Sequence, residues 1–249
     1  MKISLIIPVY NEEKYIGSCL ASIAKQKIMP DEVIVVDNNC TDATLLVIKN
    51  YPFAQVVHEK KQGMIAARNA GFNAATHEII ARCDADTKLP PNWIARIHRN
   101  FARYEIDALT GPVMFYDAPL QTSLIARAYL DMMKPIHRGG ETLIGPNMII
   151  TKAIWEKVKN KVCLNDKRVH EDIDLAYHIQ EVGGKIKRDN NLVVGTSSRR
   201  IRKNPYSFFS EYPRRLMKTL LYHDKTLIQL KKRFKLPVWY TNQKSRKKK

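Results

Sequence analysis

Two aspartates separated by one small residue are the residues whose type and spacing say most about chemistry. Asp84-Ala85-Asp86 directly follows a short, largely apolar run at residues 77–83. A strand that ends in this pattern can aim two carboxylates into one crevice, where hard divalent cations and ribose hydroxyls find oxygen ligands. In open α/β sheets such crevices lie outside the carboxyl ends of the strands. Because an isolated Asp-x-Asp is more often a solvated turn, the surrounding elements must decide between these interpretations.

Other polar clusters stand at the ends of predicted strands and at the starts of two predicted helices. They are Pro8-Val9-Tyr10-Asn11-Glu12, Asp37-Asn38-Asn39, His170-Glu171-Asp172 and the segment Lys61 to Asn69. The first two follow buried strands, so in a parallel sheet they must share one edge with the aspartate pair. The last contains Gly63 and two basic residues at a helix start, a place suited to phosphate.

The elements that must position these residues alternate between buried strands and amphipathic helices. Strands are expected at 3–8, 32–37 and 54–58 and before Asp84, and helices at 11–25, 42–50 and 66–75. Strands that are apolar on both faces and spaced by helices predict an α/β fold with a doubly wound, mostly parallel sheet and helices on both faces. Further predicted elements are a helix opened by Pro90-Pro91, a strand at 107–115, a mainly helical stretch at 119–142 with a loop at 138–140, a strand at 143–151 and a helix at 171–182.

The net charge of +18 is concentrated in the last quarter of the chain. Residues 185–249 contain 20 lysines and arginines against three acids, whereas the preceding residues are nearly neutral. Apolar and basic residues interleave over 206–233, which predicts one or two basic amphipathic helices before a flexible tail at 244–249. We expect a main domain at 1–204 and a basic helical extension at 205–249. The extension suits an anionic membrane surface; a solvated charged face and an oligomer contact are the alternatives.

Cysteine usage and the N-terminal residues indicate a reducing compartment. The four cysteines are scattered without a Cys-x-x-Cys pair, which favours buried thiols over a disulfide framework or a cysteine zinc site. Pro8 and the polar residues 11–14 cut the first apolar run too short for a signal peptide, and no apolar stretch is long enough to cross a bilayer. We expect a cytoplasmic protein, peripheral at most at the cytoplasmic face of the membrane.

Five motifs in order resemble those of the inverting nucleotide-sugar glycosyltransferases of family 2, which have the GT-A fold. The resemblance runs from Ile3 to about Gly195, and chance assembly of all five motifs is far less probable than any one alone. The motifs are Ser-Leu-Ile-Ile-Pro-Val-Tyr-Asn-Glu-Glu at 4–13, Val-Val-Asp-Asn-Asn at 35–39, Gly-x-x-x-Ala-Arg-Asn-x-Gly at 63–71, Asp-Ala-Asp at 84–86 and Glu-Asp-x-Asp-Leu at 171–175.

The resemblance implies a binding site for a nucleotide-sugar donor, with uridine diphosphate as the expected nucleotide. Tyr10 would lie against the base, above backbone groups of Pro8 and Val9, and Asp37 would accept a hydrogen bond from the base. Arg68 would face the diphosphate, where a fixed cation favours the charged leaving group. The implied donor-binding set also contains Glu12, Asn39, Gly63, Ala85, Gly145 and Asn147.

The resemblance also implies a metal-assisted single displacement with inversion. Asp86 would ligate Mg²⁺ or Mn²⁺, and Asp84 would hold ribose or a metal-bound water. Asp172 would be the general base that takes the proton from an acceptor hydroxyl, and Glu171 would hold the acceptor or orient the loop. Residues 193–198 offer hydroxyls where some relatives carry a histidine as a further metal ligand.

Two other functions stay open on the sequence. The pI of about 9.8 suits a nucleic-acid-binding protein, but no helix-turn-helix, zinc-finger or RNA-binding signature accompanies it, so a nucleic-acid partner is not expected. A nucleotidyltransferase could share the sheet and the metal site. For Glu171 and Asp172 the alternative role is an acidic first turn that complements the helix dipole. The sequence leaves open the sugar and the acceptor, whether a sugar, a lipid-linked group or a polysaccharide precursor.

Overall fold

The fold is built around one large sheet. The computed structural model describes residues 1–118, 123–136, 140–204, 206 and 210–223. In chain order the elements are β1 (Ile3–Val9), α1 (Ile16–Ala24), β2 (Glu32–Asp37), α2 (Thr44–Ile48), β3 (Ala54–His58), α3 (Met64–Ala74), β4 (Ile79–Arg82), α4 (Trp93–Arg103), β5 (Ala108–Thr110), β6 (Val113–Phe115), α5 (Ser123–Ile136), η1 (Gly145–Asn147), β7 (Met148–Thr151), α6 (Lys152–Val158), α7 (Glu171–Glu181), β8 (Ile186–Arg188), β9 (Val194–Thr196), α8 (Arg199–Lys203) and α9 (Tyr212–His223).

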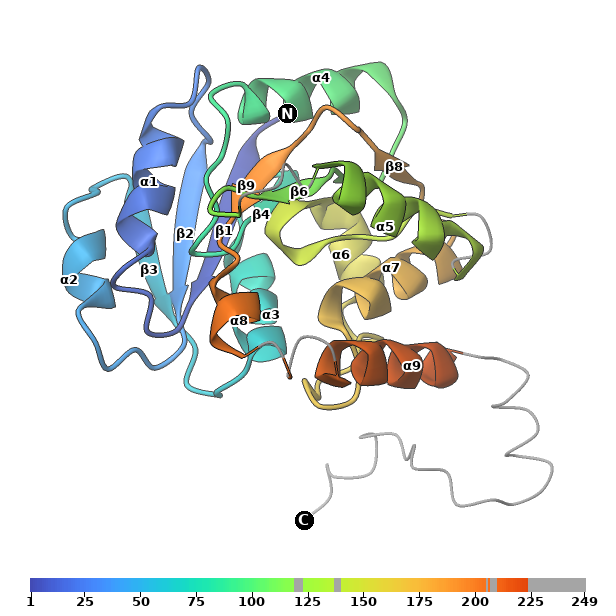
Figure 1. Ribbon diagram of the computed structural model, residues 1–249. Helices are drawn as coiled ribbons and strands as arrows, with labels where there is room; N and C mark the ends of the chain where they lie inside the picture. The colour runs from blue at the N-terminus through green and yellow to red at the C-terminus, as the bar shows by residue number, and fades with distance from the viewer. Residues whose placement is uncertain (119–122, 137–139, 205, 207–209, 224–249) are drawn as a thin grey trace, which may run out of the picture.

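Seven strands form the main sheet in the order β3-β2-β1-β4-β7-β5-β8, and β6 pairs with β9 in a small second sheet (Figure 1). β1 runs parallel to both β2 and β4, and β3 runs parallel to β2. All residues of β1 and β4 are buried. Continuous apolar runs suit central parallel strands, because helices cover both of their faces. The strands predicted at 3–8, 32–37 and 54–58 and before Asp84 are confirmed as β1, β2, β3 and β4.

One strand of the main sheet runs in the opposite direction. β7 is antiparallel to both β4 and β5, and β5 is parallel to β8, so the sheet is mixed but mostly parallel. Met148, the first residue of β7, is the register partner of Arg82 at the carboxyl end of β4. The turn η1, which precedes β7, therefore lies at the same edge as the ends of the parallel strands.

Apolar side chains pack on both faces of the main sheet. On one face Leu20 of α1 and Trp93 of α4 pack with the odd-numbered apolar residues of β1. On the other face Phe72 of α3, Trp155 of α6 and Leu175 of α7 belong to one cluster, and the Phe72 and Trp155 rings meet edge to face at 5.1 Å. Helices thus cover both faces, which confirms the predicted doubly wound α/β fold.

The strand predicted at 107–115 is divided in the structure. Gly111-Pro112 separates β5 from β6, and the two strands belong to different sheets. Pro112 has no N–H for a ladder hydrogen bond. A Cβ at Gly111 would lie 2.0 Å from the carbonyl oxygen of Leu192, so the chain turns at a point where only glycine fits.

Two other predicted elements begin later than expected. The strand predicted at 143–151 starts only at β7, because the turn η1, which contains Pro146, precedes it. The helix predicted at 11–25 starts at Ile16. Asn11 has a left-handed φ of 54°, and the N–H of Tyr15 donates to the carbonyl oxygen of Glu12 at 3.0 Å, so residues 11–15 form a turn.

The basic C-terminal residues contain the described helices α8 and α9. Figure 1 shows α9 beside α7, where the N–H of His170 donates to Thr219 Oγ1 at 2.8 Å. The tail at 244–249 and much of the interleaved stretch before it lie outside the described residues, as do 119–122 and most of the predicted loop at 138–140. The division into 1–204 and 205–249 stays a prediction. Among the described helices, none is long and apolar enough to span a bilayer.

Candidate functional site

The carboxyl ends of β1, β2 and β4 meet at one edge of the sheet. Val9 and Asp37 are register partners, and the N–H of Asn38 donates to the carbonyl oxygen of Val9 at 3.0 Å. Pro8 and Val9 are buried, whereas the side chain of Tyr10 follows them with 52% exposure. An exposed aromatic ring at a buried strand end offers an apolar face on which a flat base can stack.

Asp37 is held as an acceptor at the end of the neighbouring strand β2. Its Oδ1 accepts the N–H of Cys40 at 2.9 Å, and its Oδ2 lies 2.9 Å from His58 Nδ1. Burial acts to raise the pKa of Asp37, but the hydrogen bonds from Cys40 and His58 outweigh it and hold the pKa below its usual value. The carboxylate therefore stays ionised and can accept the imide N–H of a base.

Asn38 and Asn39 connect the end of β2 to the loop before α3. Asn38 Nδ2 donates to the carbonyl oxygens of Glu59 and Lys61, each at 2.8 Å. Asn39 has a left-handed φ of 67°, and its exposed side chain donates to the carbonyl oxygen of Lys60 at 3.1 Å. These bonds hold the loop against the strand end that carries Asp37.

The N-terminus of α3 is occupied by a carboxylate from another segment. Asp166 Oδ1 accepts the N–H of Ile65 at 2.8 Å. Gly63 has a φ of 144°, and a Cβ there would lie 2.3 Å from Asp166 Oδ2. Glycine suits position 63 because of this positive φ, which other residues rarely adopt. The helix start at which the sequence predicted phosphate already has an anionic cap.

Glu12, Asp84 and Asp86 form an acidic group into which Arg199 reaches from α8. Arg199 Nε donates to Asp86 Oδ2 at 3.0 Å, and its Nη2 bonds to Glu12 Oε1. Thr196 Oγ1 donates to Asp86 Oδ1 at 3.0 Å. Burial raises the pKa of Glu12, and burial together with the charge of Asp84 raises the pKa of Asp86. A nearby cation therefore stabilises the ionised form of these carboxylates, and Arg199 supplies that charge here.

The same carboxylates fit a hard divalent cation. Oε2 of Glu12 is buried and has no hydrogen-bond partner in the described part of the chain. Together with the carboxylates of Asp84 and Asp86 it offers the oxygen donors that Mg²⁺ and Mn²⁺ prefer. A cation that binds Asp86 Oδ2 must displace Arg199 from that oxygen. Glu12, predicted as a donor-binding residue, thus offers a third carboxylate beside the two predicted metal ligands Asp84 and Asp86.

A buried ion-pair network connects this group to the start of α7. Arg82 Nη2 donates to Asp84 Oδ1 at 2.9 Å, and Arg82 Nη1 donates to Glu171 Oε1 at 2.6 Å. Arg68 Nη1 lies 3.1 Å from Glu171 Oε2. Burial acts to raise the pKa of Glu171, but Arg82 and Arg68 outweigh it and hold the pKa below its usual value. Arg68 has no exposed surface, so a contact with a diphosphate would require it to leave Glu171.

Asp172 follows directly and faces the turn before β7. Its Oδ2 accepts the N–H of Gly145 at 3.1 Å, and its Oδ1 accepts the N–H of Ile173 at 2.9 Å. A Cβ at Gly145 would lie 3.3 Å from both Arg82 Nη2 and Glu171 Oε1. Burial, and then the neighbouring charge of Glu171, raises the pKa of Asp172. The site thus contains one carboxylate locked between arginines and another with a raised proton affinity.

Two predicted donor residues are buried. Asn147 Oδ1 accepts from Trp93 Nε1 at 3.0 Å, and Asn147 Nδ2 donates to the carbonyl oxygen of Leu192 at 2.6 Å. With 0% exposure Asn147 ties α4 and the chain before β9 to the sheet. Ala85 is 3% exposed and belongs to the apolar core. These residues support the site edge from beneath.

A family model matches the part of the chain that builds this edge. The model described as glycosyl transferase family 2 matches residues 4–156, which is more than half of the chain. The chain belongs to glycosyl transferase family 2. The matched residues include Tyr10, Asp37 and the Asp84-Ala85-Asp86 motif, while Glu171 and Asp172 follow them.

Family 2 relatives with curated names are similar over part of their length. The chain is 35% identical over 101 residues to the putative glycosyltransferase EpsH of Bacillus subtilis, which covers 39% of this chain and 29% of that protein. It is 30% identical over 120 residues to dodecaprenyl-phosphate galacturonate synthase of Rhizobium johnstonii, which covers 45% of this chain and 36% of that protein. The chain therefore spans less than half the length of these two relatives.

Solved structures share the fold at low identity. Glucosyl-3-phosphoglycerate synthase from Mycobacterium tuberculosis, in complex with Mn²⁺, UDP and glucosyl-3-phosphoglycerate, has a TM-score of 0.64 and 19% identity, over 89% of this chain and 79% of that one. S. aureus TarS 1–349 in complex with UDP-GlcNAc has a TM-score of 0.57 and 23% identity, over 77% and 56% of the two chains. These likenesses confirm the expected GT-A fold.

Sequence reasoning missed several residues of the site. Arg82 carried a signal, because a charged residue at the end of a buried strand must find a partner. Thr196 is one of the hydroxyl residues noted where relatives have a histidine. Arg199 and His58 carried no local signal, since their contacts with Asp86 and Asp37 join distant segments.

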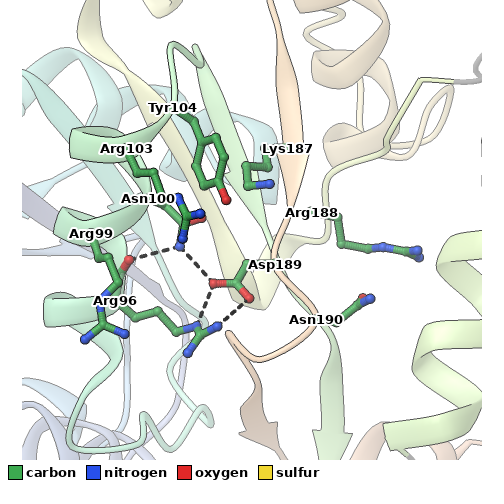
Figure 2. A pocket seen from close by; sticks show the side chains of 9 residues that line it. All are labelled: Arg96, Arg99, Asn100, Arg103, Tyr104, Lys187, Arg188, Asp189 and Asn190. Atoms are coloured by element: carbon green, nitrogen blue, oxygen red, sulfur yellow. Dashed lines mark hydrogen bonds and ion pairs between the residues drawn. The ribbon is translucent and has the colours of Figure 1, made fainter.

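A basic pocket of about 160 Å³ lies apart from this edge, between α4 and the end of β8 (Figure 2). Arg96 and Asn100 point at Asp189, with Arg96 Nε 2.6 Å and Asn100 Nδ2 2.8 Å from Asp189 Oδ2. Lys187 Nζ lies 3.9 Å from the centre of the Tyr104 ring. No predicted donor-site residue lines this pocket, so it is separate from the strand-end site.

Proposed function

We propose that this chain transfers a sugar from a nucleotide-sugar, with UDP as the nucleotide, to a hydroxyl acceptor with inversion at the anomeric carbon. The observation that supports it most is Arg82, which contacts Asp84 and also Glu171, the neighbour of Asp172. One buried arginine therefore links the acidic group to the residue next to the candidate base. Family membership supports sugar transfer, and the UDP and UDP-GlcNAc in the two solved structures support the nucleotide.

In this proposal the donor lies across the strand ends. The base stacks on Tyr10 and donates its imide N–H to Asp37, whose lowered pKa keeps it an acceptor. Asp84 and Asp86, with Glu12, would hold Mg²⁺ or Mn²⁺. A cation there supplies neutralisation of the charge that develops on the departing nucleoside diphosphate.

Asp172 is the general base of the proposed reaction. The N–H groups of Gly145 and Ile173 orient its carboxylate, and its raised pKa makes it a stronger base than an ordinary aspartate. It takes the proton of the acceptor hydroxyl as that oxygen attacks opposite to the leaving group, and a single displacement inverts the anomeric carbon. Glu171 keeps both arginines in place and thereby positions Asp172.

The proposed acceptor is lipid-linked or a polysaccharide precursor, reached at the cytoplasmic face of a membrane. The basic residues of 185–249 support attraction to an anionic lipid surface. The similarity to dodecaprenyl-phosphate galacturonate synthase supports a polyprenyl carrier.

The deciding experiment compares Asp172→Asn with the wild type on a panel of nucleotide sugars. Loss of a general base should lower the transfer rate by about 10²- to 10⁴-fold. Donor binding, measured as thermal stabilisation by UDP-sugars, should be unchanged. Asp131→Asn is the matched control, because the side chain of Asp131 is 59% exposed and lies outside the strand-end site, and its partner Arg188 also lies near Glu141. Equal loss of transfer and donor binding would contradict the assigned role, and a product carrying nucleotide would indicate a nucleotidyltransferase.

A further inference from the structure

A second group of metal-type ligands involves α7, two and six residues beyond Asp172. Asp174 and His178 stand four residues apart on α7, and His223 reaches them from the end of α9. One ligand atom from each residue lies within 4.8 Å of those of the other two. His223 Nε2 is 2.9 Å and His178 Nε2 is 3.7 Å from Asp174 Oδ1. Polar atoms from the two helices α7 and α9 therefore converge on one point.

One atom of this group lacks a partner. His178 is 8% exposed, and its Nε2 is buried without a hydrogen bond in the described part of the chain. Asp174 is 0% exposed, and the contacts described for its oxygens come from the backbone and from imidazoles. A buried polar nitrogen without a partner and a buried carboxylate are each costly. A cation bound between them would satisfy both.

The surroundings orient these side chains as the outer shell of a metal site does. Asp174 Oδ2 accepts the N–H of Cys163 at 2.8 Å, which leaves Oδ1 directed at the histidines. His178 Nδ1 lies 3.2 Å from Glu181 Oε2, so its other ring nitrogen is free to ligate. The ring of His223 stacks on Tyr177 with centroids 4.4 Å apart and planes 7° apart. Such carboxylate, backbone and ring contacts fix ligand orientation.

We propose that Asp174, His178 and His223 bind a transition-metal dication of the Zn²⁺ class. In a tetrahedral site with bonds of 2.0–2.1 Å, ligand atoms stand about 3.4 Å apart. The observed separations of 2.9 and 3.7 Å bracket that value, so small side-chain shifts would complete the geometry. Two imidazoles and one carboxylate favour Zn²⁺ over Mg²⁺ or Mn²⁺. The site is therefore chemically distinct from the oxygen-only group at Asp86.

The metal joins α9 to the helix that begins with Glu171 and Asp172. α9 also meets the residue before α7 through hydrogen bonds of His170 with Thr219 and Tyr212. A bond from His223 to a metal held by α7 fixes the end of α9 relative to α7. The chain continues into residues 224–249 from this fixed point. This role is independent of sugar transfer.

The test measures Zn²⁺ binding by the chelator-treated full chain, using competition with a chromophoric zinc indicator. The wild type should bind one Zn²⁺ that His178→Gln and His223→Gln each weaken by about 100-fold or more, since even outer-shell changes cost about 10–100-fold. Glutamine retains hydrogen-bonding ability, so both variants should fold. His98→Ala, which removes a histidine outside the group, should bind like the wild type. Asp86→Ala is included to account for any Zn²⁺ at the acidic group.

A second readout does not depend on the indicator. Zn²⁺ should raise the Tm of the wild type and of Asp86→Ala, but not that of His223→Gln. Co²⁺ should give a tetrahedral absorption spectrum in the wild type and in Asp86→Ala, but not in His178→Gln or His223→Gln. Equal Zn²⁺ affinity in wild type, His178→Gln and His223→Gln, or binding abolished by Asp86→Ala alone, would overturn the proposal and leave a hydrogen-bonded Asp174–His223 pair.

Discussion

Replacing Glu171 by glutamine should destabilise the fold, because Glu171 holds two buried arginines at once. Its Oε1 lies 2.6 Å from Arg82 Nη1 and its Oε2 lies 3.1 Å from Arg68 Nη1. The arginine side chains are 1% and 0% exposed, so water cannot replace the lost charge. Removing one partner of a buried ion pair costs about 3–5 kcal/mol, and the lower end applies because a glutamine oxygen still accepts a hydrogen bond. At about 2–4 °C per kcal/mol, the Tm should fall by about 6–12 °C.

Calorimetric unfolding of Glu171→Gln should be compared with Glu105→Gln. Glu105 pairs with Lys185 at 3.0 Å, but its side chain is 93% exposed, so that change should leave the Tm unaltered. The lowered pKa of Glu171 sets the pH dependence of the difference. The wild-type advantage should be fully present above the pKa of an unfolded glutamate and should be lost as the pH falls through the lower pKa of the folded protein. Equal Tm values for the two variants at neutral pH would refute the reasoning.

Three further predictions concern the acidic group, the base and the tail. Arg199→Ala should lower the Tm, because the carboxylates of Glu12 and Asp86 lose their counter-charge, and Mn²⁺ should restore it; a loss that Mn²⁺ does not restore would argue against a cation site. The raised pKa of Asp172 should place the acidic limb of kcat/KM above the range of an ordinary aspartate, as a pH–rate profile would show. Truncation after His223 should abolish salt-sensitive adsorption to anionic vesicles, and unchanged adsorption would exclude a membrane role for residues 224–249.

The sequence predicted the strands and helices that depend on the local hydrophobic pattern. Apolar runs such as Ile3–Val9 are long enough to identify central parallel strands, and the polar residues after them had to converge. The division of 107–115 was not predictable from periodicity, because it depends on the close approach of Leu192 to Gly111. Arg199 and Asp86 form an ion pair although they are 113 positions apart, so no local sequence spacing predicts this contact.

The site residues show the same limit. Glu171 was expected to hold the acceptor or orient the loop, and its position between Arg68 and Arg82 follows only from tertiary packing. Asn147 was expected to contact the sugar donor because of its place in a motif. In the structure its side-chain amide is hydrogen-bonded to Trp93 and to the carbonyl oxygen of Leu192. A motif therefore located the edge of the sheet but could not say which of its side chains are free to meet a ligand.

The reversed direction of β7 has a consequence for how this architecture can diversify. Because β7 runs against its neighbours, the chain arrives at the edge through Gly145–Asn147, at the end of the long connection from β6. Hydrogen bonds to β4 and β5 pin β7 from both sides, so that connection can grow, shrink or be rebuilt without shifting the register of Arg82. Lengthening a loop costs little free energy. Changes in length can thus accumulate in the connection between β6 and η1 while β1, β2 and β4 keep their register.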